Sequence, residues 1–287
     1  MQRVEFGGGD VGGADVLTVT DVMTWTGGTM RDAGTTHIAA GAALTLTGTS
    51  YKNLYGDRVL VNAGRLVYQD TGYLQLTDNA VISNTGEFDI QTDAQFHRGS
   101  VTTLFFNQGH VYKSAGIGAT DLKVPLHNAG TIQVESGGLY LSYQSVHSGT
   151  LELATGTTLE LNGTHILADT SVVSGTGQVE VSGGTVNVNG PHTFDCDLRL
   201  SGGTLNVVTT TLMGDFVQSG GTFNATAGAF TFGNGISQTV AFSSTANFND
   251  VVVAANTTLW ERGLPSKVTI NGDLMNHGLI YADFPIA

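Results

Sequence analysis

The stretch Asn128-Ala129-Gly130-Thr131-Ile132-Gln133-Val134 combines a chain corner with a strand, and it decides the fold. Gly can supply the positive φ that a sharp corner needs, and Asn tolerates the left-handed region and can bond its own backbone. The Thr, Ile, Gln and Val that follow alternate with the period of two that marks a half-buried β-strand. One such unit therefore predicts a turn that leads directly into a strand.

The same unit recurs along much of the chain. The copies that begin at Asn62, Asn84, Asn107 and Asn128 are 22, 23 and 21 residues apart, and a shortened copy begins at Ser148. Repeats of 20–50 residues are typical of stacked architectures in which each unit covers the next. The predicted corner residues of the four full copies are Asn62, Gly64, Asn84, Gly86, Asn107, Gly109, Asn128 and Gly130.

A second form of the unit follows, in which Ser-Gly-Gly-Thr precedes an apolar residue and an Asn. Its three copies begin at Ser182, Ser201 and Ser219, which are 19 and 18 residues apart. Near the C-terminus the first form returns as Asn276-His277-Gly278. The predicted corner residues of this part are Gly183, Gly184, Gly202, Gly203, Gly220, Gly221, Asn276 and Gly278.

The repeat indicates an all-β fold in which the chain coils on itself. A parallel sheet normally needs helical crossovers, yet no stretch of ten or more residues has the helical period of 3.6. A chain without helices and with a period of about 18–23 residues can instead form a β-solenoid. We expect the solenoid over residues 25–287 and a Gly-rich lead-in or cap over residues 1–24. Residues 280–287 look like the start of a further coil, so stacking beyond the C-terminus is expected.

A large β-sandwich or jelly roll is the alternative architecture. Such folds use two-residue hairpin turns, and the dipeptides Asn162-Gly163, Asn189-Gly190 and Asn271-Gly272 would suit them. The even spacing of the corners favours the solenoid.

Composition narrows the function classes. Gly accounts for 40 of the 287 residues, charged residues for 12%, and the net charge is −13. Scarce helix-forming residues exclude a helical bundle, and the absence of Gly at every third position, with only four Pro residues, excludes collagen. The 40% of hydrophobic residues excludes a disordered chain. The negative charge argues against nucleic acid and against an anionic membrane surface as partners. No run of 18 apolar residues is present, so a transmembrane helix is not expected and the chain is not predicted to be an integral membrane protein.

The first repeat form and the three Ser-Gly-Gly-Thr copies resemble the β-strand repeats of bacterial autotransporter passengers and of the filamentous-haemagglutinin group of exported adhesins. The resemblance covers about residues 25–280 and concerns turn chemistry and apolar columns, so it assigns no functional site. It implies a single-stranded right-handed parallel β-helix, export to the extracellular space or the bacterial cell surface, and adhesive or structural work. A signal peptide and a C-terminal membrane barrel, which such proteins carry, are not seen in this sequence.

Two pairs of carboxylates are the candidates for catalysis, because β-helices also serve polysaccharide lyases and glycosidases. Asp195 and Asp197 flank Cys196 and should share one strand face, and Glu87 and Asp89 do the same. We interpret both pairs as solvated faces beside buried residues. The basic residues that a lyase would need are scattered: Arg58, Arg65, Arg98, Lys113, Lys123 and Arg199.

The sequence offers two weak hypotheses for metal binding. His127 and His147 each precede a corner one repeat apart, with His165 a further 18 residues on, so stacked imidazoles could bind a transition metal. The Gly-rich stretches that contain Asp10 and Asp15 faintly resemble calcium-binding nonapeptide repeats, but they do not recur. The prediction is that the chain has no cofactor, with calcium as the alternative.

The aromatic residues and the cysteine have structural interpretations. We expect the single Cys196 to be a buried apolar residue. A set of Phe residues should stack in the core of the C-terminal third: Phe216, Phe223, Phe230, Phe232, Phe242 and Phe248. A set of Tyr residues is expected to be partly exposed: Tyr51, Tyr55, Tyr68, Tyr73, Tyr140 and Tyr143.

These observations favour a non-enzymatic structural or adhesive β-solenoid module. Its expected partners are copies of itself or adjacent repeat modules, and surface glycans. A carbohydrate-active enzyme and a phage-type receptor-binding spike remain the alternatives.

Overall fold

The computed structural model describes residues 3–100, 102–233, 235–262 and 268–282, and the strands formed there stack as a parallel β-solenoid of about 13 turns. Within those residues the structure has 37 strands and no helix. The strand pairings of the faces described below are parallel, and Asn162-Gly163 lies inside strand β23 (Thr158–Leu167), where a hairpin would need a turn. The predicted all-β solenoid is thus confirmed, and the sandwich is excluded.

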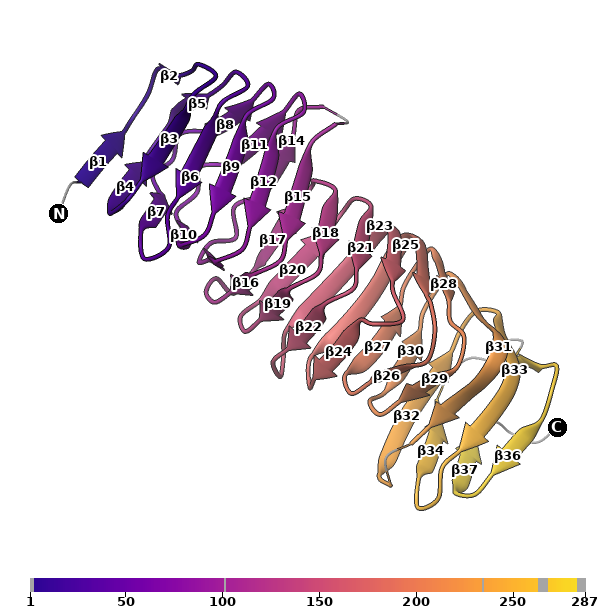
Figure 1. Ribbon diagram of the computed structural model, residues 1–287. Coiled ribbons are helices and arrows are strands. Elements are labelled where there is room, and N and C mark those ends of the chain that lie inside the picture. Colours follow the sequence, from indigo (N-terminus) through magenta and orange to yellow (C-terminus); the bar gives the residue numbers. More distant parts are fainter. Residues whose placement is uncertain (1–2, 101, 234, 263–267, 283–287) are drawn as a thin grey trace. The chain divides into compact units, whose positions relative to one another are not determined.

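The chain divides into two compact units, Met1–Ser145 and Val146–Ala287. In the first unit every coil contributes one strand to each of three faces (Figure 1). Face A contains β1 (Arg3–Phe6), β4 (Val22–Trp25), β7 (Ala43–Leu46), β10 (Arg65–Tyr68), β13 (Glu87–Ile90), β16 (His110–Lys113) and β19 (Thr131–Val134). Face B contains β2 (Asp10–Val11), β5 (Gly28–Met30), β8 (Lys52–Tyr55), β11 (Leu74–Thr77), β14 (Phe96–Arg98), β17 (Ala119–Leu122) and β20 (Gly138–Leu141).

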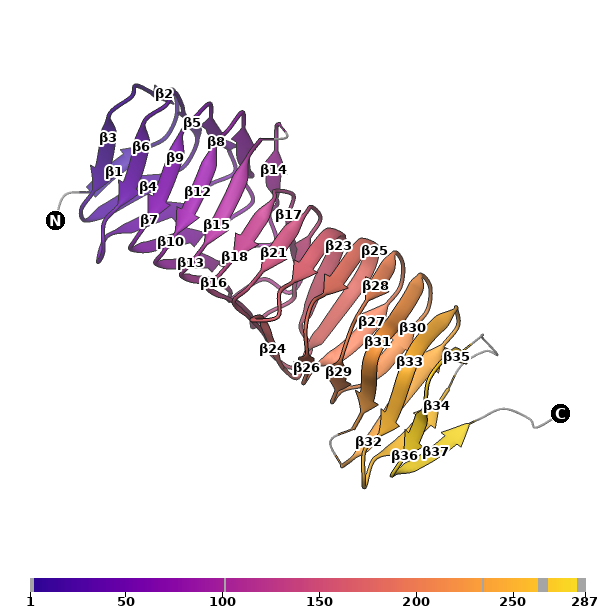
Figure 2. The ribbon, with the colours of Figure 1, turned by 45° about the vertical axis from the view of Figure 1, so that its right-hand side comes forward.

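Face C completes the first unit, and Figure 2 shows its strands side by side. It contains β3 (Val16–Val19), β6 (Thr35–Ile38), β9 (Val59–Asn62), β12 (Val81–Asn84), β15 (Leu104–Asn107) and β18 (Leu126–Asn128). Because β1, β2 and β3 pair in register with β4, β5 and β6, the segment expected as a lead-in or cap forms the first coil. Strand β21 (Ser145–His147) lies at the division between the units.

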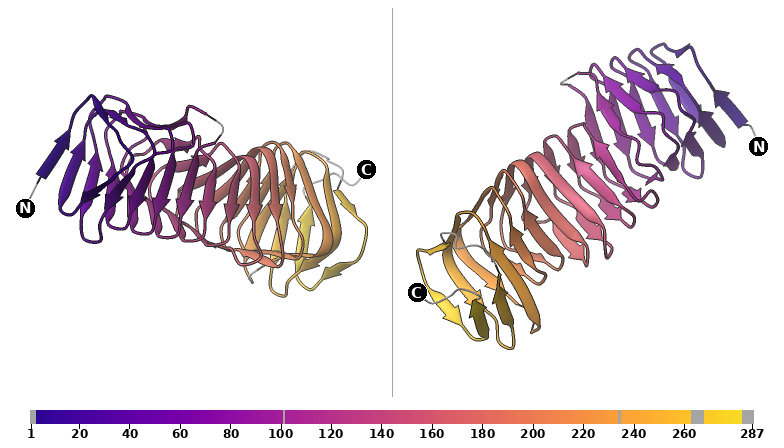
Figure 3. Two further views of the ribbon diagram at one scale, coloured as in Figure 1. Left: turned by 45° about the horizontal axis from the view of Figure 1, so that its top comes forward. Right: turned by 180° about the vertical axis from the view of Figure 1, so that it is seen from behind.

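The second unit also has three faces, and two views in Figure 3 show its strands stacked coil on coil. Face D contains β22 (Thr150–Leu153), β24 (Val172–Gly175), β26 (His192–Phe194), β29 (Thr210–Leu212), the later parts of β31 (Thr222–Phe232) and β33 (Ala246–Val253), and β36 (Leu274–Asn276). Face E contains the first parts of β23 and β25 (Gln178–Val188), then β27 (Asp197–Leu200), β30 (Phe216–Gln218), β32 (Ser237–Phe242), β34 (Thr258–Glu261) and β37 (Leu279–Ala282). Face F contains the later parts of β23 and β25, β28 (Thr204–Asn206), the first parts of β31 and β33, and β35 (Val268–Ile270).

The core of each unit consists of inward columns with one residue from each coil. On face A, one column contains Met23, Leu44, Leu66, Phe88, Val111 and Ile132, all fully buried. Apolar burial is worth roughly 25 cal/mol per Å², so these columns supply the main force that holds coil on coil. In the second unit the six predicted core Phe residues are all buried and contact one another, which confirms that prediction.

Candidate functional site

The Asn residues of the first repeat form point into the core, where they form a ladder of amides. Asn62, Asn84, Asn107 and Asn128 end strands β9, β12, β15 and β18, and all four are buried. The Nδ2 of each of the first three donates to the Oδ1 of the next, at 2.7, 2.8 and 2.7 Å. None of the four has a positive φ, so the expectation of a left-handed backbone was wrong for them. An inward amide is tolerated because the next coil supplies its partner.

The glycines at these corners are needed for space, since Gly64, Gly86, Gly109 and Gly130 do not have positive φ. A Cβ on any of them would lie 2.1–2.3 Å from a carbonyl oxygen of the preceding coil. The predicted positive φ is confirmed for a different set: Gly184, Gly203 and Gly221.

Two of the predicted corners differ from the rest. Gly183 and Gly184 lie within the continuous strand β25, although the sequence places a corner there. At the last corner, Asn276 is exposed, and its Oδ1 accepts from the Gly278 N–H at 3.1 Å. The local backbone bond expected for Asn is also present at Asn84 and Asn107, whose Nδ2 donate to the carbonyls of Gly86 and Gly109 at 3.2 and 3.4 Å.

Of the two acidic pairs, Asp197, Glu87 and Asp89 are engaged in coil-to-coil contacts. Asp89 is buried, so the interpretation as a solvated face was wrong for it. Asp195 and Asp197 point outward while Cys196 is buried, as predicted. Glu87 and Asp89 share Arg65, whose Nε lies 2.8 Å from Glu87 and whose Nη2 lies 2.7 Å from Asp89. These hydrogen bonds raise the pKa of Arg65. A carboxylate that is ion-paired with an arginine is favoured in its ionised form and exchanges protons poorly, so we interpret this pair as a structural bridge between coils.

The other scattered cations have separate partners. Arg58 and Lys113 are inward and buried, and Lys113 Nζ lies 2.9 Å from Asp93. The Arg98 guanidinium lies over the Tyr143 ring, with Cζ 3.6 Å from the ring centroid, and its Nη2 donates to the Tyr143 hydroxyl. Lys123 and Arg199 each lie 3.6 Å from an acidic residue, Asp121 and Glu180 respectively.

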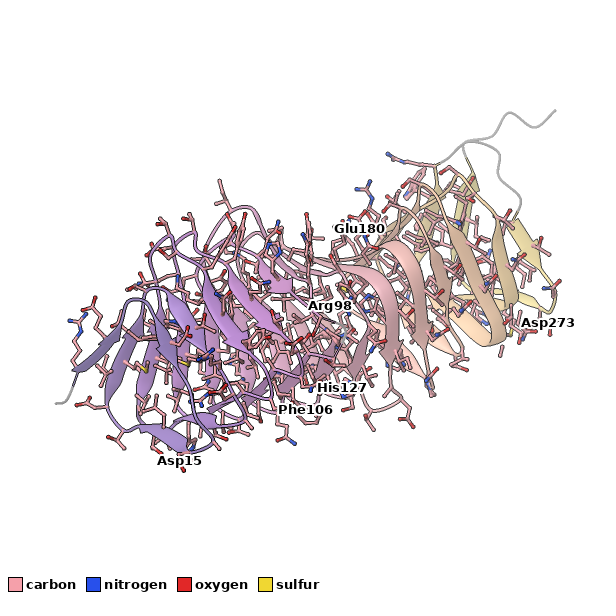
Figure 4. The ribbon with its side chains drawn as sticks, turned by 90° about the horizontal axis from the view of Figure 1, so that it is seen from above. Asp15, Arg98, Phe106, His127, Glu180 and Asp273 are labelled. Atoms are coloured by element: carbon pink, nitrogen blue, oxygen red, sulfur yellow. The ribbon has the colours of Figure 1, made fainter. Side chains whose placement is uncertain are left out.

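The histidines do not form the stacked column that a metal site would need. His127 is exposed, and the centroid of its ring lies 5.7 Å from that of Phe106 (Figure 4). His147 and His165, by contrast, are fully buried. Side chains on opposite faces of their strands cannot share one ion, so the predicted His stack is wrong. Across the described parts of the chain, no group of three or more His, Cys, Asp or Glu is placed to hold a metal. Asp10, from the calcium hypothesis, pairs with Arg31 at 3.3 Å.

Cys196 is buried, and desolvation raises the pKa of its thiol to about 12. Because the thiolate is the reactive form, we expect Cys196 in the folded protein to resist alkylation. Iodoacetamide at pH 8, followed by mass spectrometry, should give no adduct in buffer and full labelling in urea. Labelling in buffer at the rate of a free thiol would contradict the buried placement.

An open groove runs along the corner between faces A and B of the first unit. It has a volume of about 550 Å³ and is lined by side chains that include Asp70, Tyr73, Gln91 and Asp93. They come from five-residue corners at 69–73, 91–95 and 114–118, which connect β10 to β11, β13 to β14 and β16 to β17. No repeat motif identified these residues.

Of the Tyr residues expected to be partly exposed, Tyr68 is instead fully buried, which raises its pKa.

The last described coil leaves its inward side uncovered. Four apolar residues of this coil pair in register with core residues of the coil before, yet they are 36–53% exposed: Val268, Ile270, Leu274 and Ile280. An apolar hollow of about 170 Å³ lies among them and the Phe cluster.

Comparison with protein-family models, with curated proteins and with solved structures found no match to this chain. The fold and these sites therefore carry the functional argument alone. Among the described residues, no helix is long and apolar enough to cross a membrane.

Proposed function

We propose that the chain is a non-enzymatic structural or adhesive module of an extracellular or bacterial surface assembly, and that its copies join end to end. The observation that carries this proposal is the open last coil. Its inward apolar side chains are in register to continue the core columns, and they meet no further coil within the described residues.

The first coil offers a matching surface. Val4 and Leu17 pair in register with the buried Met23 and Thr36, so they face inward, yet both are exposed. The coil ends also present strand edges, which are templates for pairing with another chain. Stacking the last coil of one copy on the first coil of another is a heterologous contact, and such contacts generate filaments when they do not close into a ring.

Adjacent residues of β36 provide the test. Leu274 faces inward and is 53% exposed, whereas Met275 pairs with the outward Val252 and is 43% exposed. We expect Leu274→Lys to abolish end-to-end association, because it places a charge in the apolar contact, and Met275→Lys to leave association unchanged.

Sedimentation velocity over a range of protein concentrations, with electron microscopy of the same samples, measures this difference. Concentration-dependent species in the unaltered protein that disappear only in Leu274→Lys would support the proposal. A strictly monomeric protein, or a closed trimer that both variants retain, would contradict it.

A further inference from the structure

We propose that the groove between faces A and B of the first unit binds a neutral glycan chain. This proposal deepens the adhesive part of the proposed function and rests on it. The groove crosses the corners of three successive coils, which at ~4.8 Å per coil gives a track of about 10 Å parallel to the coil stack. A track of this length and openness suits consecutive sugar rings of an extended chain.

The lining supplies hydrogen-bond acceptors for sugar hydroxyls. Asp70 Oδ2 accepts from the Thr47 hydroxyl and from Gly48 N–H at 2.8 Å. The Gln91 amide nitrogen donates to Asp89 at 2.7 Å. Among the described residues, neither Asp70 Oδ1 nor the side-chain oxygen of Gln91, Oε1, has a hydrogen-bond donor, so both can accept a hydrogen bond from a ligand. The same hydrogen bonds lower the pKa of Asp70, which keeps its carboxylate charged in weakly acidic solution.

One aromatic side chain, Tyr73, lines the groove, and two further rings flank it. Tyr73 lines it and stacks on Tyr51, with ring centroids 5.3 Å apart, while the His97 ring lies 4.6 Å from Tyr73 on the other side. Tyr51 is 56% exposed. A tyrosine side chain with a polar tip can pack against the C–H surface of a sugar while acceptors nearby bind its hydroxyls.

The corners that carry these groups are fixed before any ligand arrives. Asp93 bridges two coils, because its Oδ1 lies 2.9 Å from Lys113 Nζ and its Oδ2 accepts from Gly118 N–H at 3.0 Å. The Thr92 hydroxyl donates to the Asp70 carbonyl, which ties a third coil to the same corner. Groups held in this way lose little freedom on binding, so a shallow groove can still bind specifically.

Charge selects the class of glycan. Two carboxylates, Asp70 and Asp93, line the groove, and no lysine or arginine is among its lining residues, because Lys113, which offsets the charge of Asp93, is buried. A uronate or sulfated chain would therefore find no cation in the groove to pair with and would approach a chain of net charge −13. A neutral polyol chain satisfies the acceptors without adding charge.

The test is affinity electrophoresis in native gels that contain hydroxyethylcellulose, glucomannan, galactan or dextran, with polygalacturonate as the acidic probe. We expect at least one neutral polymer to retard the protein and polygalacturonate to have no effect. Tyr73→Ala and the blocking variant Thr71→Trp should weaken retardation at least about tenfold in dissociation constant, equal to 1.4 kcal/mol. Tyr55→Ala, which removes an exposed tyrosine that is not among the groove's lining residues, should bind as the unaltered protein does.

Two further measurements keep the result interpretable. Thr71 is exposed and has no partner among the described residues, so Thr71→Trp should fold normally even if Tyr73→Ala does not; circular dichroism checks this. Leu274→Lys, which blocks association, should still bind the polymer, so a failure of assembly and a failure of the groove are separable. Retardation by polygalacturonate alone, by no neutral polymer, or equally in Thr71→Trp would overturn the proposal.

Discussion

Replacing Asn107 by alanine should lower the free energy of unfolding by about 2–4 kcal/mol, one of the two largest losses we expect from a single substitution. Its Oδ1 accepts from Asn84 at 2.8 Å, and its Nδ2 donates to Asn128 Oδ1 at 2.7 Å and to the Thr131 carbonyl at 3.1 Å. The side chain is fully buried, so water cannot replace it. Alanine would remove the hydrogen bond from Asn107 Nδ2 to Asn128 Oδ1 and also open a cavity.

A second amide ladder supplies the control. Asn187, Asn206 and Asn224 stack outward on face F, with Nδ2 to Oδ1 distances of 2.8 and 3.0 Å, and they are half-buried. Water can satisfy the amides that Asn206→Ala would leave, so its loss should be below about 1 kcal/mol. Urea unfolding followed by circular dichroism and tryptophan fluorescence measures both. Equal losses for Asn107→Ala and Asn206→Ala would show that burial of the first ladder is not what matters.

The variant Asn107→Asp adds a pH dependence with a defined sign. Burial would raise the pKa of the new carboxyl in the folded protein above its unfolded value of about 4. A raised folded pKa means that the folded state binds the proton more tightly. The deficit of Asn107→Asp relative to the unaltered protein should therefore grow as pH rises from 4 to 7. A deficit that shrinks over this range would contradict the inward placement.

The sequence predicted what depends on alternation and period, and it missed what depends on register between coils. Strand phase placed Phe223 and Phe230 in the core, and the spacing of 21–23 residues predicted stacked coils. The same spacing could have predicted the Asn ladder, because identical residues one coil apart lie next to each other on neighbouring coils. The Asn-x-Gly motif is also typical of a local turn, and that interpretation does not predict side-chain contacts between coils. Tyr68 is in phase with Leu66, so alternation alone could have placed it inside.

The groove could not be predicted in this way, because no motif marks it. Its side chains come from corners that are about one coil apart in the sequence, and each corner taken alone is an ordinary polar turn. Only the coil-to-coil pairing of β10 with β13, and of β13 with β16, brings Asp70, Gln91 and Gly116 to one surface. The carboxylate pairs that strand alternation suggests, which include Glu87 and Asp195, therefore lie outside the groove lining.

Gly109→Ala should cost about 3–5 kcal/mol, although alanine suits the backbone there. The φ of Gly109 is not positive, so the loss would come from space alone. A Cβ would lie 2.2 Å from the carbonyl oxygen of Gly86 and 2.6 Å from the carbonyl carbon of Thr85, and backbone atoms cannot rotate away. The coils would have to separate at this corner, next to the Asn ladder that sits two residues earlier.

Gly8→Ala is the matched control for this prediction. Gly8 also lacks a positive φ, and a Cβ there would meet nothing within 4 Å, so its effect should stay within about 0.5 kcal/mol. Urea midpoints of the two variants separate the explanations. If Gly109→Ala and Gly8→Ala unfold at the same urea concentration, close approach of the coils is not the reason for glycine. If only Gly109→Ala is destabilised, the repeated Gly allows neighbouring coils to pack closely at this corner. The same close contact with a carbonyl oxygen of the preceding coil occurs at Gly64, Gly86 and Gly130.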